Sequence, residues 1–102
     1  MQTYVQVSNQ KEFDEALDAN INTNKVIVIT NATESIIAYD VKNTIEVRDG
    51  TLVAAKCKNI IAMNNAKVLA YYSVVYGNDN SFILNKNSTC LLYDLAASEK
   101  IF

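Results

Sequence analysis

The stretch NIIAMNNAKVLA, residues 59–70, decides the fold class. It holds two copies of an apolar-x-apolar triplet, at 60–62 and 68–70, with two asparagines between them. Apolar residues at a spacing of two are typical of a β-strand, because successive side chains point to opposite faces. Asn tolerates the left-handed backbone region that a tight corner requires. We therefore expect two short strands joined by a corner.

The same triplet recurs from residue 36 to the end of the chain. Its first positions are Ile36, Ile45, Leu52, Ile60, Val68, Val74, Phe82 and Cys90, and its third positions are Ala38, Val47, Ala54, Ala62, Ala70, Tyr76, Leu84 and Leu92. The intervals between units are 9, 7, 8, 8, 6, 8 and 8 residues. Asn, Asp or Gly stands between most units, as expected for corners.

Short, evenly spaced strands form either a meander or a solenoid. In a solenoid, equivalent positions stack at about 4.8 Å from coil to coil, so each column keeps its size class. The small residues Ala38, Ala54, Ala62 and Ala70 fit this demand. We predict an all-β solenoid, a short right-handed parallel β-helix with two or three strands per coil.

The N-terminal segment has a different pattern, which predicts a cap for the solenoid. Residues 4–7 alternate as a strand, Ser8 is a candidate helix N-cap, and a helix is expected from about residue 9 to 19. Its apolar face would consist of Phe13, Ala16, Leu17 and Ile21. Residues 25–30 read as a buried strand that ends at a corner. A cap protects an open solenoid end, which would otherwise expose unpaired backbone.

The expected organisation is one domain, residues 1–102, because a chain of this length supports one modest core. Residues 1–30 form the strand–helix–strand cap with one N-terminal capping α-helix, residues 31–94 the solenoid repeats, and residues 95–102 a C-terminal tail. The tail contains no cap of similar size, so another chain is a candidate to cover that end.

Composition argues against several function classes. Lys and Arg number 9 against 11 Asp and Glu, for a net charge of −2, so no basic field exists to hold nucleic acid. His is absent and the two cysteines, Cys57 and Cys90, have no ligand-like spacing, so neither a metal site nor a cofactor is expected. No signal peptide and no long apolar run is present, which predicts a cytoplasmic protein without a membrane partner.

Catalytic patterns are missing as well, and we do not expect an enzyme. The corner residues Asp40, Asp49, Asp79 and Asp94 include carboxylates that could in principle act as an acid–base pair, but turn formation explains them better. The chain shows no phosphate loop, nucleophile elbow or calcium-binding nonapeptide.

Three segments carry a resemblance: residues 31–40, 65–71 and 88–94, each built on an Asn-Ala-Thr-x-x-Ala-Tyr-like pattern. They resemble the tandem octapeptide-like β-helix repeats of small bacterial and prophage proteins. The resemblance covers about residues 31 to 94 and implies a β-helix in a mobile-element context. Because small phage proteins are often inhibitors of host defence, it also implies an anti-CRISPR-like inhibitor as one possible role.

The middle residue of each triplet is the main functional candidate. If the first and third positions point inward, the middle ones point outward, and all but Glu46 are aliphatic. An exposed apolar column marks an interaction surface, and tyrosines beside it would serve as anchors. The predicted interface, with a protein partner or a second copy, consists of Ile37, Val53, Ile61, Leu69, Val75, Ile83, Leu91, Tyr39, Tyr71, Tyr72, Tyr93, Ile101 and Phe102.

Three alternatives to our first hypothesis remain open for these residues. The N-terminal helix could cover one face of the column and an irregular coil could bury other members, which would make them structural. The chain could be a carbohydrate-binding or carbohydrate-cleaving module that uses Tyr and Asp at the coil edges. It could also be a structural segment of a larger assembly. Our first hypothesis is a non-enzymatic protein-binding protein that forms a homodimer or higher homo-oligomer.

Overall fold

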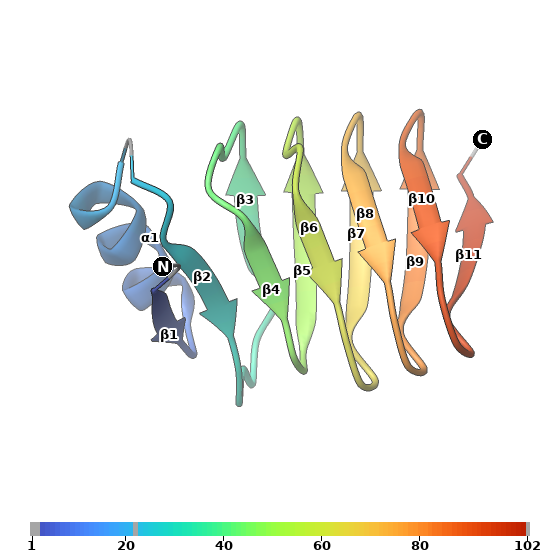
Figure 1. Ribbon diagram of the computed structural model, residues 1–102, viewed down its shortest axis with the longest axis horizontal. Coiled ribbons are helices and arrows are strands. Elements are labelled where there is room, and N and C mark those ends of the chain that lie inside the picture. The colour runs from blue at the N-terminus through green and yellow to red at the C-terminus, as the bar shows by residue number, and fades with distance from the viewer. Residues whose placement is uncertain (1–2, 22, 102) are drawn as a thin grey trace.

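A computed structural model describes residues 3–21 and 23–101, and it shows a parallel β-solenoid of about five turns (Figure 1). One short helix lies at its N-terminal end, as the sequence predicted. The elements in chain order are β1 Tyr4–Val7, α1 Gln10–Ala19, β2 Val26–Ile29, β3 Ile36–Tyr39, β4 Ile45–Val47, β5 Thr51–Ala55, β6 Ile60–Ala62, β7 Lys67–Tyr71, β8 Val74–Gly77, β9 Phe82–Lys86, β10 Thr89–Leu92 and β11 Ala97–Lys100.

The strands form two parallel sheets, so each coil contains two strands. Sheet A has the order β1-β2-β4-β6-β8-β10, and sheet B has the order β11-β9-β7-β5-β3. Consecutive strands from β2 onward alternate between the sheets, as Figure 1 shows. In sheet A, Ile45 stacks on Ile60, Ile60 on Val75 and Val75 on Cys90, a constant coil length of 15 residues.

The core lies between the sheets and consists of stacked columns. In sheet B one column is Ile36, Leu52, Val68 and Ile83, and the next is Ala38, Ala54, Ala70 and Asn85. Ile36, Leu52 and Ile83 have no exposed surface. Ala62 belongs to a separate column of sheet A, between Val47 and Gly77. The predicted size-class rule therefore holds for Ala38, Ala54 and Ala70 in sheet B, but it fails for the column of Ala62, whose members change in size from Val47 to Gly77 and Leu92.

The predicted alternation is wrong by one residue in β8 and β9. Val75 and Ile83, which we expected to point outward, are fully buried. The core column continues from Ala62 through Gly77, where an added Cβ would lie 2.9 Å from Cδ1 of Ile83. Gly77 thus leaves room for the end of the Ile83 side chain, and Tyr76 points outward while its neighbours Val75 and Gly77 lie in the core.

Corners occupy two lines along the solenoid and use residues with positive φ. One line contains Asp40, Lys56, Tyr72 and Asn87, and the other contains Asn31, Gly50, Asn64, Asp79 and Asp94. The Asn, Asp and Gly members follow the prediction, because these residues tolerate the left-handed region. Lys56 and Tyr72 occupy equivalent positions although neither residue type favours this conformation.

The helix caps the N-terminal end of the solenoid, as expected. It packs against β1, β2 and β3 (Figure 1), and Phe13 is fully buried in the core cluster. Its N-cap is Asn9 and not the predicted Ser8: the Asn9 side chain accepts a hydrogen bond from the Glu12 N–H at 2.8 Å. Ile21 lies beyond the end of the helix and is 70% exposed, so it does not belong to the apolar face.

The Gln10 side chain of this helix forms hydrogen bonds to the outer backbone edge of β3. The Ile37 N–H donates to Oε1 of Gln10 at 2.7 Å, and Nε2 of Gln10 donates to the Ile37 carbonyl at 2.9 Å. The Gln10 amide thus replaces a neighbouring strand at this position. The opposite end of the solenoid is built differently, because the predicted tail contains a further strand, β11, which pairs with β9.

Candidate interaction surfaces

The outer face of sheet B carries a continuous apolar column. Ile37, Val53, Leu69 and Leu84 stack in register across β3, β5, β7 and β9. Each alternates with buried neighbours in its strand, so all four side chains point away from the core. Ile37 is 62% exposed, and the other three are partly exposed.

Aromatic side chains and lysines flank this column. Tyr39 and Tyr71 lie in the adjacent outward column, separated by Ala55, and Phe82 stacks on Lys67 on the other side. Tyr39 is 64% exposed, and the Lys56 ammonium lies 5.6 Å from the centre of its ring. Lys56, Lys67 and Lys86 are all exposed. We call this surface, from Ile37 to Leu84 with its flanking residues, the sheet B face.

The helix does not cover the sheet B face. It lies at the N-terminal end (Figure 1), and even Ile37, on the strand that it contacts, keeps most of its surface exposed. The alternative in which α1 buries the predicted column is therefore wrong for this surface.

The predicted interface residues divide between several locations. Ile37, Val53 and Leu69 lie on the sheet B face together with Tyr39 and Tyr71. The remaining predicted residues are Ile61 and Leu91 on the outer side of sheet A, Tyr72 at a corner, Tyr93 after β10, Ile101 after β11, and the buried Val75 and Ile83. Phe102 lies outside the described residues.

Sequence reasoning missed Leu84 and Phe82, because it placed both inside the core. The step between coils decides the phase of β9. In sheet B this step is 16 residues from Ile36 to Leu52 and from Leu52 to Val68, but it shortens to 15 at β9, which places Ile83 inside and Leu84 outside. The triplet pattern does not reveal this choice, because either alternation of β9 places apolar side chains inside: Phe82 and Leu84 in one case, and Ile83 in the other.

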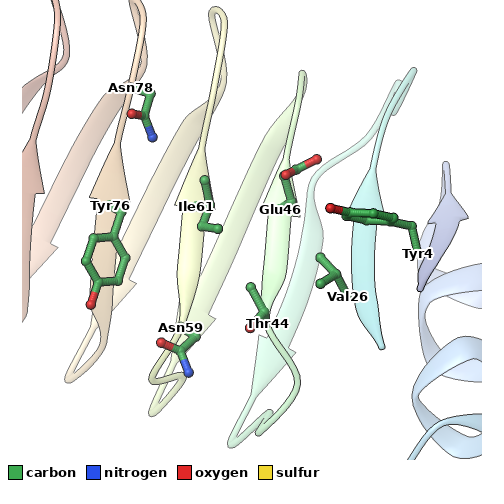
Figure 2. A pocket seen from close by; sticks show the side chains of 8 residues that line it. All are labelled: Tyr4, Val26, Thr44, Glu46, Asn59, Ile61, Tyr76 and Asn78. Atoms are coloured by element: carbon green, nitrogen blue, oxygen red, sulfur yellow. The ribbon is translucent and has the colours of Figure 1, made fainter. Parts of the chain in front are cut away.

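A shallow depression of about 450 Å³ lies on the outer side of sheet A (Figure 2). Tyr4 and Tyr76 stand at its two ends, and Glu46 and Ile61 lie between them. The Arg48 guanidinium donates to the Glu46 carboxylate at 2.7 Å, within a salt bridge. The remaining lining residues are Val26, Thr44, Asn59 and Asn78. Sequence reasoning did not assemble this site, because its residues come from five strands of sheet A, β1, β2, β4, β6 and β8, and from positions beside them.

A second depression of about 690 Å³ lies between the end of the helix and the corner after β3. Its lining includes Leu17, Ile21, Tyr39 and Val41, together with Asp40 and Lys42. It adjoins the sheet B face through Tyr39, whose side chain belongs to both surfaces.

The corner carboxylates hold the coils together. Oδ2 of Asp79 accepts a hydrogen bond from the Asn64 N–H at 2.9 Å, and Oδ2 of Asp94 accepts one from the Asp79 N–H at 3.2 Å. Residues at successive corners thus bind the backbone of the preceding coil. Serines do the same at the other line of corners, where the Cys57 N–H donates to Oγ of Ser73 at 3.1 Å. This arrangement supports the turn-forming interpretation of the aspartates.

We expect Asp79→Ala to lower the free energy of unfolding by about 1 to 2 kcal/mol, because it removes the bond to Asn64 and places Ala at positive φ. Asp79→Asn keeps an acceptor oxygen and the preference for this conformation, so its effect should stay below about 0.5 kcal/mol. Urea denaturation of the two variants measures the difference. Equal large losses for both would show that the charge of the carboxylate, and not its acceptor, matters here.

The two thiols differ in surroundings. Cys57 is buried, and Cys90 is partly exposed in the last coil. Burial raises the pKa of both thiols, because a desolvated thiolate is disfavoured. In the part of the chain that the structure describes, no group of three or more Cys, Asp or Glu side chains is arranged to hold a metal ion.

Comparisons with known proteins add no relative: no family model, curated protein or solved structure matches the chain. Among residues 3–21 and 23–101, no helix is long and apolar enough to cross a membrane.

Proposed function

We propose that this protein is a non-enzymatic binding protein that recognises a protein partner through the sheet B face. The observation that carries the proposal is the column Ile37, Val53, Leu69 and Leu84, which is outward, in register and uncovered. The largest contiguous apolar patch on a soluble protein is often its interaction site.

The composition of the face matches that of a protein interface. Aromatic residues are enriched among binding hot spots, and Tyr39, Tyr71 and Phe82 flank the column. Each aliphatic side chain that passes from exposed to buried contributes about 1.5 to 3 kcal/mol, and the already shielded Val53, Leu69 and Leu84 contribute less. Association costs about 4 to 15 kcal/mol, so the tyrosines are needed as additional anchors.

Charge narrows the kind of partner. The three lysines around the face, Lys56, Lys67 and Lys86, favour a partner whose apolar patch has an acidic rim. Inhibition of a host defence machine, which the repeat resemblance implies, is one form that such binding takes.

Paired substitutions test the proposal. Leu69→Asp places a charge at the centre of the sheet B face, whereas Ile61→Asp makes the same kind of change at a partly exposed position on the outer side of sheet A. The wild-type chain should capture a partner protein from a lysate of the source cells, and Ile61→Asp should bind that partner with unchanged affinity. We expect Leu69→Asp to lower the affinity at least about tenfold, equivalent to about 1.4 kcal/mol. Retention by both variants, with both folded, would contradict the proposed surface.

A second candidate function, carbohydrate binding, rests on the depression in sheet A. Two tyrosine rings with the Glu46 carboxylate and the Asn59 amide between them combine apolar stacking surfaces with hydrogen-bonding groups (Figure 2). A glycan array with the wild type and Tyr76→Ala tests this function. Glycan binding that is lost in Tyr76→Ala supports it, and binding of no glycan by the wild type removes it.

A further inference from the structure

The C-terminal end of the solenoid presents two strand edges, β10 of sheet A and β11 of sheet B. The Thr89 N–H donates to the Ser73 carbonyl at 2.9 Å, and the Tyr93 N–H donates to the Gly77 carbonyl at 2.8 Å. Backbone groups alternate sides along a strand. The N–H and C=O groups of Cys90 and Leu92 therefore point away from β8, toward the open edge.

The same reasoning applies to β11. The Ala97 N–H donates to the Ser81 carbonyl at 3.1 Å, and the Ile101 N–H donates to the Asn85 carbonyl at 2.7 Å. The backbone groups of the intervening Ser98 and Lys100 thus face the same open end. In the described residues, no segment of the chain pairs with either edge.

Apolar side chains gather at this end. Leu91, Leu92, Tyr93 and Leu95 are all exposed, Leu95 by 78%. Leu92 continues the core column of Gly77 and is nevertheless 42% exposed, because β10 is the last strand of sheet A among the described residues. At the N-terminal end α1 packs against β1, β2 and β3, and Gln10 satisfies the edge of β3 at Ile37. The two ends therefore differ: a helix packs against the first coil, and in the described residues no helix packs against the last, although the outer edge of β1 also has no strand partner.

We propose that the open end binds a second copy of this chain, tail to tail, in a dimer that pairs β10 with β10 of its partner. A twofold axis along the normal of sheet A sets β10 against β10 of the partner and reverses strand direction, so the pairing is antiparallel. A register centred on Leu91 sets Cys90 opposite the partner's Leu92 and Leu92 opposite the partner's Cys90. The edge-facing backbone groups of both residues then exchange hydrogen bonds, and the two Leu91 side chains meet on the outer face.

Three features favour a second copy over an extended peptide from another protein. The open end offers two strand edges at one level, and a single peptide strand satisfies only one of them. The molecule measures 34 × 28 × 23 Å with the solenoid axis along the longest dimension (Figure 1), so an end of at most 28 by 23 Å offers up to roughly 640 Å² per copy and about 1,300 Å² per pair, at the lower end of the range of stable interfaces. Finally, β11 carries Glu99 and Lys100, so its charges sum to zero in each copy.

The symmetry of the contact limits this association to two chains. A head-to-tail contact between different ends would continue into a fibre, whereas a symmetric tail-to-tail contact uses the same surface of both copies and closes on itself. At the other end, Gln10 occupies the edge of β3 and α1 packs against β1, β2 and β3.

Light scattering over a hundredfold range of concentration tests the proposal with two variants of one outward column. Leu91→Lys sets two like charges against each other across the axis, and Ile61→Lys makes the same change two strands away in the same column. We expect the wild type and Ile61→Lys to rise from 11.3 kDa toward twice that mass, and Leu91→Lys to remain at 11.3 kDa with an unchanged circular dichroism spectrum. Alkylation of Cys90 should also slow severalfold as the wild type is concentrated.

Leu69→Asp distinguishes the proposed dimer from the proposed partner binding, because Leu69 lies on the sheet B face and not at the C-terminal end. It should leave the dimer mass unchanged even where it abolishes partner capture. A wild type that stays at 11.3 kDa throughout, a mass that grows without limit, or a dimer that Leu69→Asp dissociates and Leu91→Lys does not would each overturn the tail-to-tail arrangement.

Discussion

We expect Ile83→Asp to unfold the protein, whereas Leu84→Asp leaves it folded. The two residues are neighbours in β9, and the structure places Ile83 in the core with no exposed surface and Leu84 on the sheet B face. Truncation of a buried aliphatic side chain alone costs about 2 to 5 kcal/mol, and an unpaired buried charge adds several more. That sum is comparable to the whole stability of a small domain, about 5 to 15 kcal/mol.

Circular dichroism and urea denaturation of the pair measure this contrast. Leu84→Asp should lower the free energy of unfolding by no more than about 1 kcal/mol, because surface substitutions have small effects. If Leu84→Asp were the more damaging substitution, Leu84 would lie inside and Ile83 outside, as the triplet pattern predicted. That result would contradict the register of β8 and β9.

We also expect Phe13→Ala to destabilise the protein by about 3 to 5 kcal/mol, the cost of removing a buried aromatic ring. Phe13 is the largest fully buried side chain, and it joins the cap to the core cluster that contains Val7 and Ile36. Because the cap protects the first coil, its loss should also expose the edge of β3 and promote aggregation.

Glu15→Ala is the matched control, since Glu15 lies on the same helix and is exposed. Thermal unfolding followed by circular dichroism gives the stability difference, and light scattering detects aggregation. If the free energy of unfolding of Phe13→Ala lay within about 1 kcal/mol of that of the control, the packing of the helix on the first coil would not stabilise the protein as we expect.

The solenoid was predictable from the sequence because its demands are local. Strand-forming triplets at short intervals, corner residues such as Asn64 and Asp79, and the small column of Ala38, Ala54 and Ala70 each follow from one or two neighbouring positions. The helix, β1 and β2 were likewise predicted from their own periodicity, and the structure confirms them.

The phase of the later strands was not predictable in the same way. Every residue from Val74 to Tyr76 is compatible with the core, and the choice depends on Gly77, whose missing side chain leaves space for Ile83 from the opposite sheet. Such a contact joins residues of two sheets, and the triplet pattern carries no information about it. The same applies to Gln10, whose amide replaces a strand that the sequence does not reveal.

The candidate site was predicted in part. The outward position of Ile37, Val53 and Leu69 follows from alternation and is confirmed. Their separation from Ile61 and Leu91 depends on the number of strands per coil, which the spacing of units left open. With two strands per coil, consecutive triplets lie on opposite sheets, so the single predicted ladder becomes two surfaces.

Site-specific photo-cross-linking tests the central claim, that the sheet B face binds a protein partner, most directly. A benzophenone side chain would replace Leu69 or Leu84 on that face, and Ile61 on the outer side of sheet A as the control. We predict that the first two positions cross-link to the same foreign protein after irradiation in a lysate of the source cells and that the third does not. Cross-links from Ile61 alone, or none from Leu69 and Leu84 in folded protein, would contradict the account.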